Sequence, residues 1–96
     1  MPAKIKESEV ERQIVKFAKD NDCLAFKFVS PGQRGVPDRL FLKDGKVLFL
    51  EIKQKGKAPT PIQEFQIRQI REQGIAAHWA GDVHTGNLLI DAILLK

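Results

Sequence analysis

The sequence has few of the residues that cross-link small domains or bind zinc: one cysteine and two histidines among 96 residues. The single Cys23 excludes an internal disulfide, and two histidines cannot complete the usual zinc quartet of Cys and His ligands. No stretch approaches the ~20 apolar residues of a transmembrane helix, and residues 1–10 mix charged with apolar side chains where a signal peptide is apolar. We therefore expect a soluble, cytoplasmic protein without a membrane partner.

The residues that are present are those of an ordinary globular chain. Hydrophobic residues make up 43% and charged residues 29%, which favours a single folded domain over residues 1–96. The net charge of +4 is concentrated in residues 31–57, which contain seven basic and three acidic residues. A concentrated positive field attracts polyanions, and nucleic acid is the commonest of them. A solvated basic face without a partner is the alternative.

Apolar periodicity and turn residues predict the elements. Helical spacing from Val10 to Ala18 predicts a first helix over residues 8–19, with Ser8 and Glu11 in the pattern of a capping box. Thr60 and Gln63 repeat that pattern at the start of a second helix. The predicted strands cover residues 23–29, 38–43, 46–53 and 75–80, and the second and third helices cover residues 60–73 and 88–95.

The predicted order is helix, three strands, helix, strand, helix. This order indicates an α/β fold with a mixed four-stranded sheet that contains an antiparallel hairpin. His78 and Trp79 are assigned to the end of the fourth strand and to its packing. Residues 88–95 are apolar nearly all round, so they must be covered, either by the core of this chain or by a second copy.

The Asp-Gly pair at 44–45 is the strongest local signal, because it favours a two-residue hairpin turn. Counting outward from that turn places Asp38 directly opposite Glu51. Directly opposed side chains project from one face with Cβ atoms about 4.5–5.5 Å apart. Both faces of the hairpin are apolar at mid-strand, so we expect it to lie inside the sheet with both faces covered.

Two carboxylates about 5 Å apart repel by ~3 kcal/mol at an effective dielectric near 20, so something must neutralise them. A proton on one acid would do so, as would Lys53, which strand alternation places beside Glu51. A divalent cation is the third possibility, and carboxylates without Cys or His favour Mg²⁺ or Mn²⁺ over zinc. The alternative without a metal is a salt-bridged strand end, with Glu51 paired to Lys53 or to Arg39.

These residues also carry a resemblance. Residues 35–39 (Gly-Val-Pro-Asp-Arg) and 51–53 (Glu-Ile-Lys) resemble the Pro-Asp…Glu-x-Lys signature of the restriction-endonuclease-like nuclease superfamily. Residues 28–32 (Phe-Val-Ser-Pro-Gly) before that signature, and Gln63 at the next helix, resemble more narrowly the virus-type replication-repair nuclease (VRR-NUC) family in its short stand-alone form. The resemblance covers residues 7–80.

The resemblance implies a restriction-endonuclease-like core and a nuclease that hydrolyses DNA phosphodiester bonds with Mg²⁺ or Mn²⁺. Asp38 and Glu51 would bind the metal, together with the backbone carbonyl of Ile52. Lys53 would position or activate the attacking water and stabilise charge on the phosphate.

Two helical residues would complete the site in the family's pattern. Gln63 would approach it from the second helix and Glu11 from the first, with Glu7 the other acidic candidate. Gln63 and Glu11 each also fit a capping box, and the two roles are compatible.

Further polar residues could contact phosphate or could simply be solvated. They are Lys27, Ser30, Gln33, Arg34, Arg39, Lys55 and Lys57. Such contacts position nucleic acid without reading its sequence, and no base-reading helix is evident, so we expect recognition by shape and backbone.

Short members of the family resemble homodimeric resolvases of four-way (Holliday) junctions, which implies branched DNA as substrate, a homodimer, and a role in DNA repair or recombination. It also suggests a bacterial or phage source. The alternatives are a nuclease acting on flaps, nicks or ends, and a structure-specific DNA-binding module without catalysis.

Overall fold

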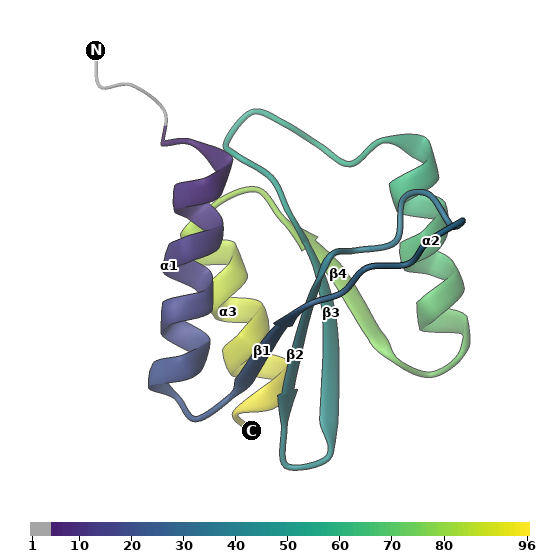
Figure 1. Ribbon diagram of the computed structural model, residues 1–96. Coiled ribbons are helices and arrows are strands. Elements are labelled where there is room, and N and C mark those ends of the chain that lie inside the picture. The colour runs from purple at the N-terminus through teal and green to yellow at the C-terminus, as the bar shows by residue number, and fades with distance from the viewer. Residues whose placement is uncertain (1–4) are drawn as a thin grey trace.

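The computed structural model describes residues 5–96, and its elements follow the predicted order (Figure 1). The elements are α1 (Glu7–Asp20), β1 (Leu24–Lys27), β2 (Arg39–Lys43), β3 (Lys46–Ile52), α2 (Pro61–Glu72), β4 (Ala76–Ala80) and α3 (Val83–Leu94). The strands form one sheet in the order β1-β2-β3-β4, antiparallel except for the parallel pair β3–β4. The predicted mixed α/β fold is confirmed. Within residues 5–96, no helix is long and apolar enough to cross a membrane.

The core lies between one face of the sheet and the helices α1 and α3, which pack side by side (Figure 1). From the sheet it takes Phe41, Leu48 and Leu50, all fully buried. From α3 it takes Ile90 and Leu94, also fully buried. The apolar C-terminal helix is therefore largely core of this chain, which decides one of the alternatives that the sequence left open.

The other face of the sheet is only partly covered. Helix α2 lies on this side and contacts chiefly β4 (Figure 1). Leu24 on β1 is 58% exposed, Phe26 is also exposed, and Leu42 is only half-buried. The expectation that both faces of the hairpin are covered is therefore wrong, because a single helix beside β4 does not extend across β1 and β2.

The three helices begin in different ways. For α2 the predicted capping box of Thr60 and Gln63 is confirmed. For α1 the predicted box is wrong: Lys6 is the N-cap, and it makes no side-chain hydrogen bond. Acidic residues in the first turn of α1 favour this start because they oppose the positive end of the helix dipole. Helix α3 begins before the apolar run because the side chain of Asp82 accepts a hydrogen bond from the amide of Thr85 (2.7 Å).

A glycine sets the distance between α1 and α3. A Cβ added to Gly86 on α3 would lie 2.3 Å from Cδ1 of the fully buried Ile14 on α1. Gly86→Ala should therefore destabilise the protein by about 1–3 kcal/mol through overpacking, although alanine favours helix. Urea unfolding measures the loss. Because Ile14→Val removes the nearest atom, the double variant should lose less than the sum of the two single losses, whereas additive losses would contradict the contact.

Candidate active site

The turn between β2 and β3 fixes the position of the acid pair. Residues 44 and 45 both have positive φ, 49° and 80°, as a type I′ turn requires. Pairing starts at the turn and runs to Arg39 opposite Leu50, which is the predicted register. The next position places Asp38 opposite Glu51, on the sheet face that α2 only partly covers.

The backbone on both sides of the pair is held by further sheet hydrogen bonds. The amide of Phe28 donates to the carbonyl of Asp38 (2.8 Å), and the amide of Lys53 donates to the carbonyl of Ala80 (2.8 Å). Pro37, directly before Asp38, is fully buried. The candidate site is therefore built on the sheet framework.

Glu51 is the buried member of the pair, with 8% of its surface exposed, whereas Asp38 is exposed. Burial, followed by the charge of Asp38, raises the pKa of Glu51 from 4.5 to about 7. The charge of Glu7 acts in the same direction. Lys53 opposes the shift, with its Nζ 3.7 Å from Oε2 of Glu51. Burial and the charge of Asp38 together outweigh this lysine, so the pKa of Glu51 stays raised.

The donor set fits a hard divalent cation. Carboxylate oxygens are the ligands that Mg²⁺ and Mn²⁺ prefer, and they are present without Cys or His. Among residues 5–96, no group of three or more acidic, Cys or His side chains is placed to hold a metal. An ion shared by Asp38 and Glu51 would therefore need backbone oxygen, such as the carbonyl of Ile52, and water. Mg²⁺ usually keeps several waters, so two carboxylates are a suitable protein contribution.

The two acidic candidates on α1 have different surroundings. Oε1 of Glu11 lies 3.2 Å from Nη2 of Arg39 and 3.6 Å from Nζ of Lys27. Strand alternation puts these two basic side chains on the α1 face, away from Asp38. Glu7, one turn earlier, is the α1 acid whose charge acts on Glu51. The structure thus brings Glu7 into the field of the pair and holds Glu11 in an ion cluster. The predicted catalytic role of Glu11 and the DNA contacts of Lys27 and Arg39 stay predictions.

The loop before Asp38 rests on the start of α2. Nε2 of Gln66 donates to the carbonyl of Arg34 (3.1 Å). Gly35 has a φ of 82°, and a Cβ there would lie 2.9 Å from the backbone carbonyl of Ile62. Only glycine allows this conformation and this close approach. The loop therefore ties the start of β2, where Asp38 lies, to α2.

Gln63 is engaged in the cap of α2. Its Oε1 accepts a hydrogen bond from the amide of Thr60 (2.9 Å), and its own amide donates to Oγ1 of Thr60 (3.3 Å). The side-chain nitrogen is not used in this cap, so the predicted role of Gln63 at the site is compatible with it and stays a prediction.

The other predicted phosphate contacts lie in the two loops that flank the pair. Ser30, Gln33 and Arg34 belong to the loop before β2, where the amide of Gln33 donates to the carbonyl of Ser30 (3.2 Å). Lys55 and Lys57 belong to the connection from β3 to α2. Ser30 is half-buried and the other four are exposed, so they are accessible to a polyanion.

Trp79 is the residue whose position the sequence analysis missed. It was assigned to packing, but the indole is 39% exposed. In the parallel pair β3–β4 it lies beside Glu51, so it projects from the same face as the acid pair. A helix and two loops separate these strands, so no local signal fixes their register. The available hint was Gly81 two residues on, which leaves room for the indole.

Comparison with known proteins fits this architecture. No family model matches the sequence. A solved structure described as "VRR_NUC domain" shares the fold with a TM-score of 0.80 and 25% identity, covering 88% of this chain and 94% of that chain. The chain belongs to the VRR-NUC family. A second solved structure, "VRR_NUC domain protein", matches this VRR-NUC domain with a TM-score of 0.76 and 20% identity, covering 93% of this chain and 88% of that one.

A curated relative of this VRR-NUC domain is "Putative nuclease p44" of Acyrthosiphon pisum secondary endosymbiont phage 1. The two are 48% identical over 60 residues, which are 62% of this chain and 64% of the relative. The match therefore spans less than two thirds of that relative's length. The family membership inferred from the Pro-Asp…Glu-x-Lys residues and the loop before them is confirmed.

Glu51→Gln should stabilise the metal-free VRR-NUC domain, and more so as the pH rises. The folded pKa of about 7 lies above the ordinary 4.5, so ionisation of Glu51 between these values favours the unfolded chain. In EDTA, the Tm of the variant should be close to that of the wild type near pH 5 and clearly higher at pH 8. Glu64→Gln, an exposed acid on α2, is the matched control and should show no such trend. A variant less stable than wild type at pH 8 would contradict the raised pKa of Glu51.

Proposed function

We propose that this VRR-NUC domain is a Mg²⁺- or Mn²⁺-dependent endonuclease that hydrolyses phosphodiester bonds in branched DNA. One observation carries the proposal: the hairpin register directs Asp38 and Glu51 to one face, and the amine of Lys53 lies 3.7 Å from Glu51. The description of the phage relative as a nuclease supports it.

Each residue would have a distinct role. Asp38 and Glu51 would hold the cation with the carbonyl of Ile52, and Glu51 must lose its proton to do so. A bound divalent ion acidifies water and neutralises phosphate charge. Lys53 would orient the attacking water and stabilise charge that develops on the phosphate. The amine of Lys53 already lies 3.7 Å from Glu51, so little rearrangement of this side chain would be needed for catalysis.

Recognition of the DNA would rest on its backbone. Exposed Arg34, Lys55 and Lys57 flank the acid pair in two loops. The N-terminal ends of all three helices lie at the same end of the molecule as the open end of the hairpin (Figure 1). Their partial positive charges favour phosphate there. Such contacts do not read the base sequence, which agrees with a substrate recognised by its shape.

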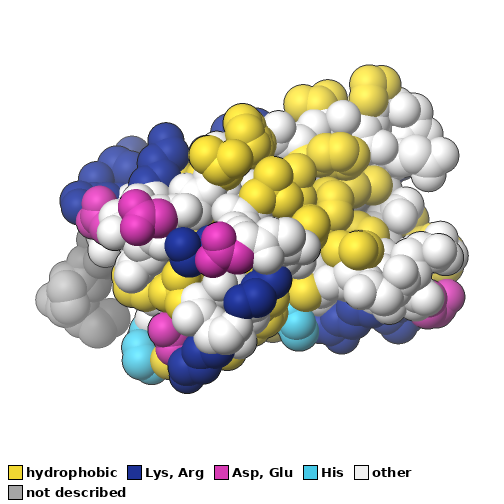
Figure 2. All heavy atoms as spheres, turned by 90° about the horizontal axis from the view of Figure 1, so that it is seen from below, with side chains coloured by type: hydrophobic (Ala, Val, Ile, Leu, Met, Phe, Trp, Pro, Cys, Tyr) yellow, Lys and Arg dark blue, Asp and Glu magenta, His cyan; other side chains and the backbone are white. Residues whose placement is uncertain are grey.

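A homodimer would pair two such sites on a two-fold symmetric junction. The surface that suits this role is the apolar sheet face, which we define as Leu24, Phe26, Leu40, Leu42, Val47 and Phe49. Figure 2 shows apolar side chains gathered on this side of the molecule. Apolar patches of this kind mark interaction sites. The polar backbone of DNA offers them no complement, whereas a second copy does.

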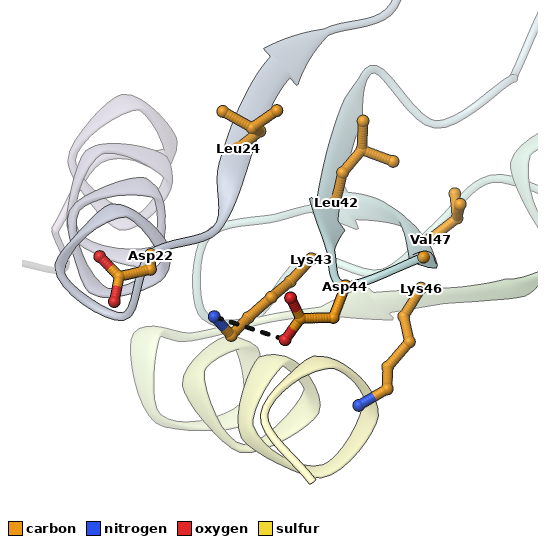
Figure 3. A pocket seen from close by; sticks show the side chains of 8 residues that line it. Asp22, Leu24, Leu42, Lys43, Asp44, Lys46 and Val47 are labelled. Carbon is orange, nitrogen blue, oxygen red and sulfur yellow. Dashed lines mark ion pairs between the residues drawn. The ribbon is translucent and has the colours of Figure 1, made fainter.

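The rim of this face carries charges of both signs. A cavity of about 380 Å³ lies between β1 and the hairpin turn and includes Leu24, Leu42 and Val47 in its wall (Figure 3). Asp22, Lys43, Asp44, Gly45 and Lys46 complete the wall. Nζ of Lys46 donates to the carbonyls of Leu94 and Lys96, and Nζ of Lys43 lies 3.8 Å from Oδ2 of Asp44, so these lysines are engaged within the chain. The attraction for a second copy would therefore come from the apolar side chains.

Cleavage of labelled DNA tests the nuclease proposal. Four-way, flap, nicked and linear duplexes should be incubated with Mg²⁺, Mn²⁺ or EDTA. We expect cutting of the four-way junction in either metal and none in EDTA. Asp38→Asn should lower the rate by several orders of magnitude and leave binding intact or tighter, because it removes negative charge near phosphate. Asp20→Asn, an exposed acid near the other end of α1, is the control and should cut normally.

The outcomes separate the candidate functions. Preferential cutting of flaps, nicks or ends would select the alternative nuclease. Binding that survives in EDTA without cleavage in either metal would select a DNA-binding module and reject catalysis by Asp38 and Glu51.

Sedimentation at micromolar concentration tests the dimer. Leu24→Glu should convert a dimer into a monomer because it places a charge in the apolar sheet face. Leu88→Glu changes an equally exposed leucine on α3 (54% against 58%) and should leave the dimer intact. A wild-type monomer, or equal effects of both variants, would reject this interface.

A further inference from the structure

A second cavity, of about 260 Å³, lies between α2 and the edge of β4. Its wall is formed by Glu64, Ile67, Arg68, Arg71 and Trp79, and we call it the Trp79 cavity. This wall combines one large aromatic surface, one aliphatic side chain, two guanidinium groups and one carboxylate. None of these five residues has a part in the chemistry proposed for the acid pair.

The Trp79 cavity is next to the proposed site of cleavage. Trp79 and Glu51 are register partners on adjacent parallel strands, which lie about 4.8 Å apart and direct paired side chains to the same face. A group held against the indole is therefore within one nucleotide's reach of the acid pair.

The indole of Trp79 packs on the backbone at Gly81 and is partly exposed to solvent. A Cβ added to Gly81 would lie 3.1 Å from Cζ3 of Trp79, so the ring packs over the glycine. The carbonyl of Lys57 lies 3.9 Å from the same point, which places this seat beside the loop that carries the basic flank of the site. With 39% of Trp79 exposed, a planar surface is presented to solvent in a fixed position.

The two arginines are held differently. Nε of Arg71 donates to the carbonyl of Ala77 (2.6 Å), and its Nη2 contacts Nδ1 of His78 (2.8 Å). Burial, followed by the charge of Arg71, lowers the pKa of His78, so its neutral ring can accept this hydrogen bond. Arg68 is exposed and has no ion pair within residues 5–96. Arg71 is thus an anchored part of the wall, and Arg68 retains its donors for a ligand.

We propose that the Trp79 cavity binds one unpaired nucleotide of the DNA substrate, with the base against the indole of Trp79 and an adjoining phosphate on Arg68. This inference rests on the proposed function, since it places the nucleotide beside the acid pair that would cut the strand. It specifies the substrate further: the branched DNA must offer an unpaired base at the point of cleavage.

The chemistry of the wall favours a nucleotide over other occupants. Bases stack on aromatic side chains whatever their sequence, and arginine adds both charge and a planar surface. The cavity of about 260 Å³ is small for a ligand site, which suits a single base better than a larger ligand. Glu64 can accept a hydrogen bond from an exocyclic amino group. A purely apolar peptide would leave these charges unpaired.

The chain contains its own reporter, because Trp79 is the single tryptophan and there is no tyrosine. Its fluorescence should be followed in EDTA, where cleavage cannot occur, while labelled DNA is titrated and its anisotropy is recorded in parallel. The probes are a duplex with one unpaired thymidine, the same duplex with an abasic site at that position, and the fully paired duplex. We expect strong quenching by the unpaired thymidine and little by the other two.

Substitutions test the same contact through affinity. Trp79→Ala should weaken binding of the unpaired-thymidine duplex about tenfold and leave the fully paired duplex unchanged. Trp79→Phe should restore part of that affinity, which a merely structural role would not explain. Arg68→Ala should weaken binding and its dependence on salt. Phe65→Ala, which removes a similarly exposed aromatic of α2 outside the cavity wall (43%), is the control and should bind normally.

Three further outcomes would count against the inference, and a fourth would count against the nuclease proposal alone. Equal quenching by the fully paired duplex would overturn selection of an unpaired base. Binding seen by anisotropy without a change in fluorescence would overturn stacking and leave the nuclease proposal standing. Fluorescence that shifts on dilution of the protein alone would show that a second copy covers Trp79. Quenching by the unpaired thymidine without cleavage in either metal would instead reject the nuclease and retain the nucleotide site.

Discussion

The pairing of Asp38 with Glu51 across the β2–β3 hairpin is the constraint on which the rest of the site depends. Burial removes Glu51 from water, and the neighbouring acid makes its ionisation harder still, so the pair is tolerable only beside positive charge. Lys53 supplies part of that charge. The helix N-termini gathered at this end supply partial charges of the same sign (Figure 1). In the proposed function, a divalent cation would supply the rest of the positive charge.

The sheet divides its two faces between stability and function. The fully buried residues Phe41, Leu48 and Leu50 all face α1 and α3, and the close approach at Gly86 locks those helices together. The opposite face carries the acid pair and Trp79, with α2 as its only helix in residues 5–96. In the proposed function, the part of this face around the acid pair would have to admit DNA and a metal, so it could not be sealed by packing. The exposed apolar surface of β1 follows from the same division.

Local chemistry could be predicted from the sequence, and contacts between distant segments could not. The Asp-Gly turn fixes its own register, so the pairing that ends at Arg39 and Leu50, one position before Asp38 and Glu51, followed from counting. The cap of α2 followed from adjacent residues in the same way. The Ser8 cap failed because propensity at a helix start competes with longer-range pairing, here that of Glu11 with Arg39. The extent of helix coverage and the position of Trp79 depend on the crossover to β4, which no local pattern encodes.

The parallel pair β3–β4 fixes the spacing between Glu51 and Trp79. Glu51 and Trp79 sit on neighbouring strands whose hydrogen bonding continues past them, from the amide of Lys53 to the carbonyl of Ala80. The distance between a base on the indole and a phosphate at the acid pair would therefore be set by sheet geometry, which loops cannot vary. An enzyme that recognises shape needs such a reference, because backbone contacts by themselves allow DNA to slide by whole nucleotides. One stacked base would remove that freedom, so the cut would be placed by where pairing ends and not by sequence.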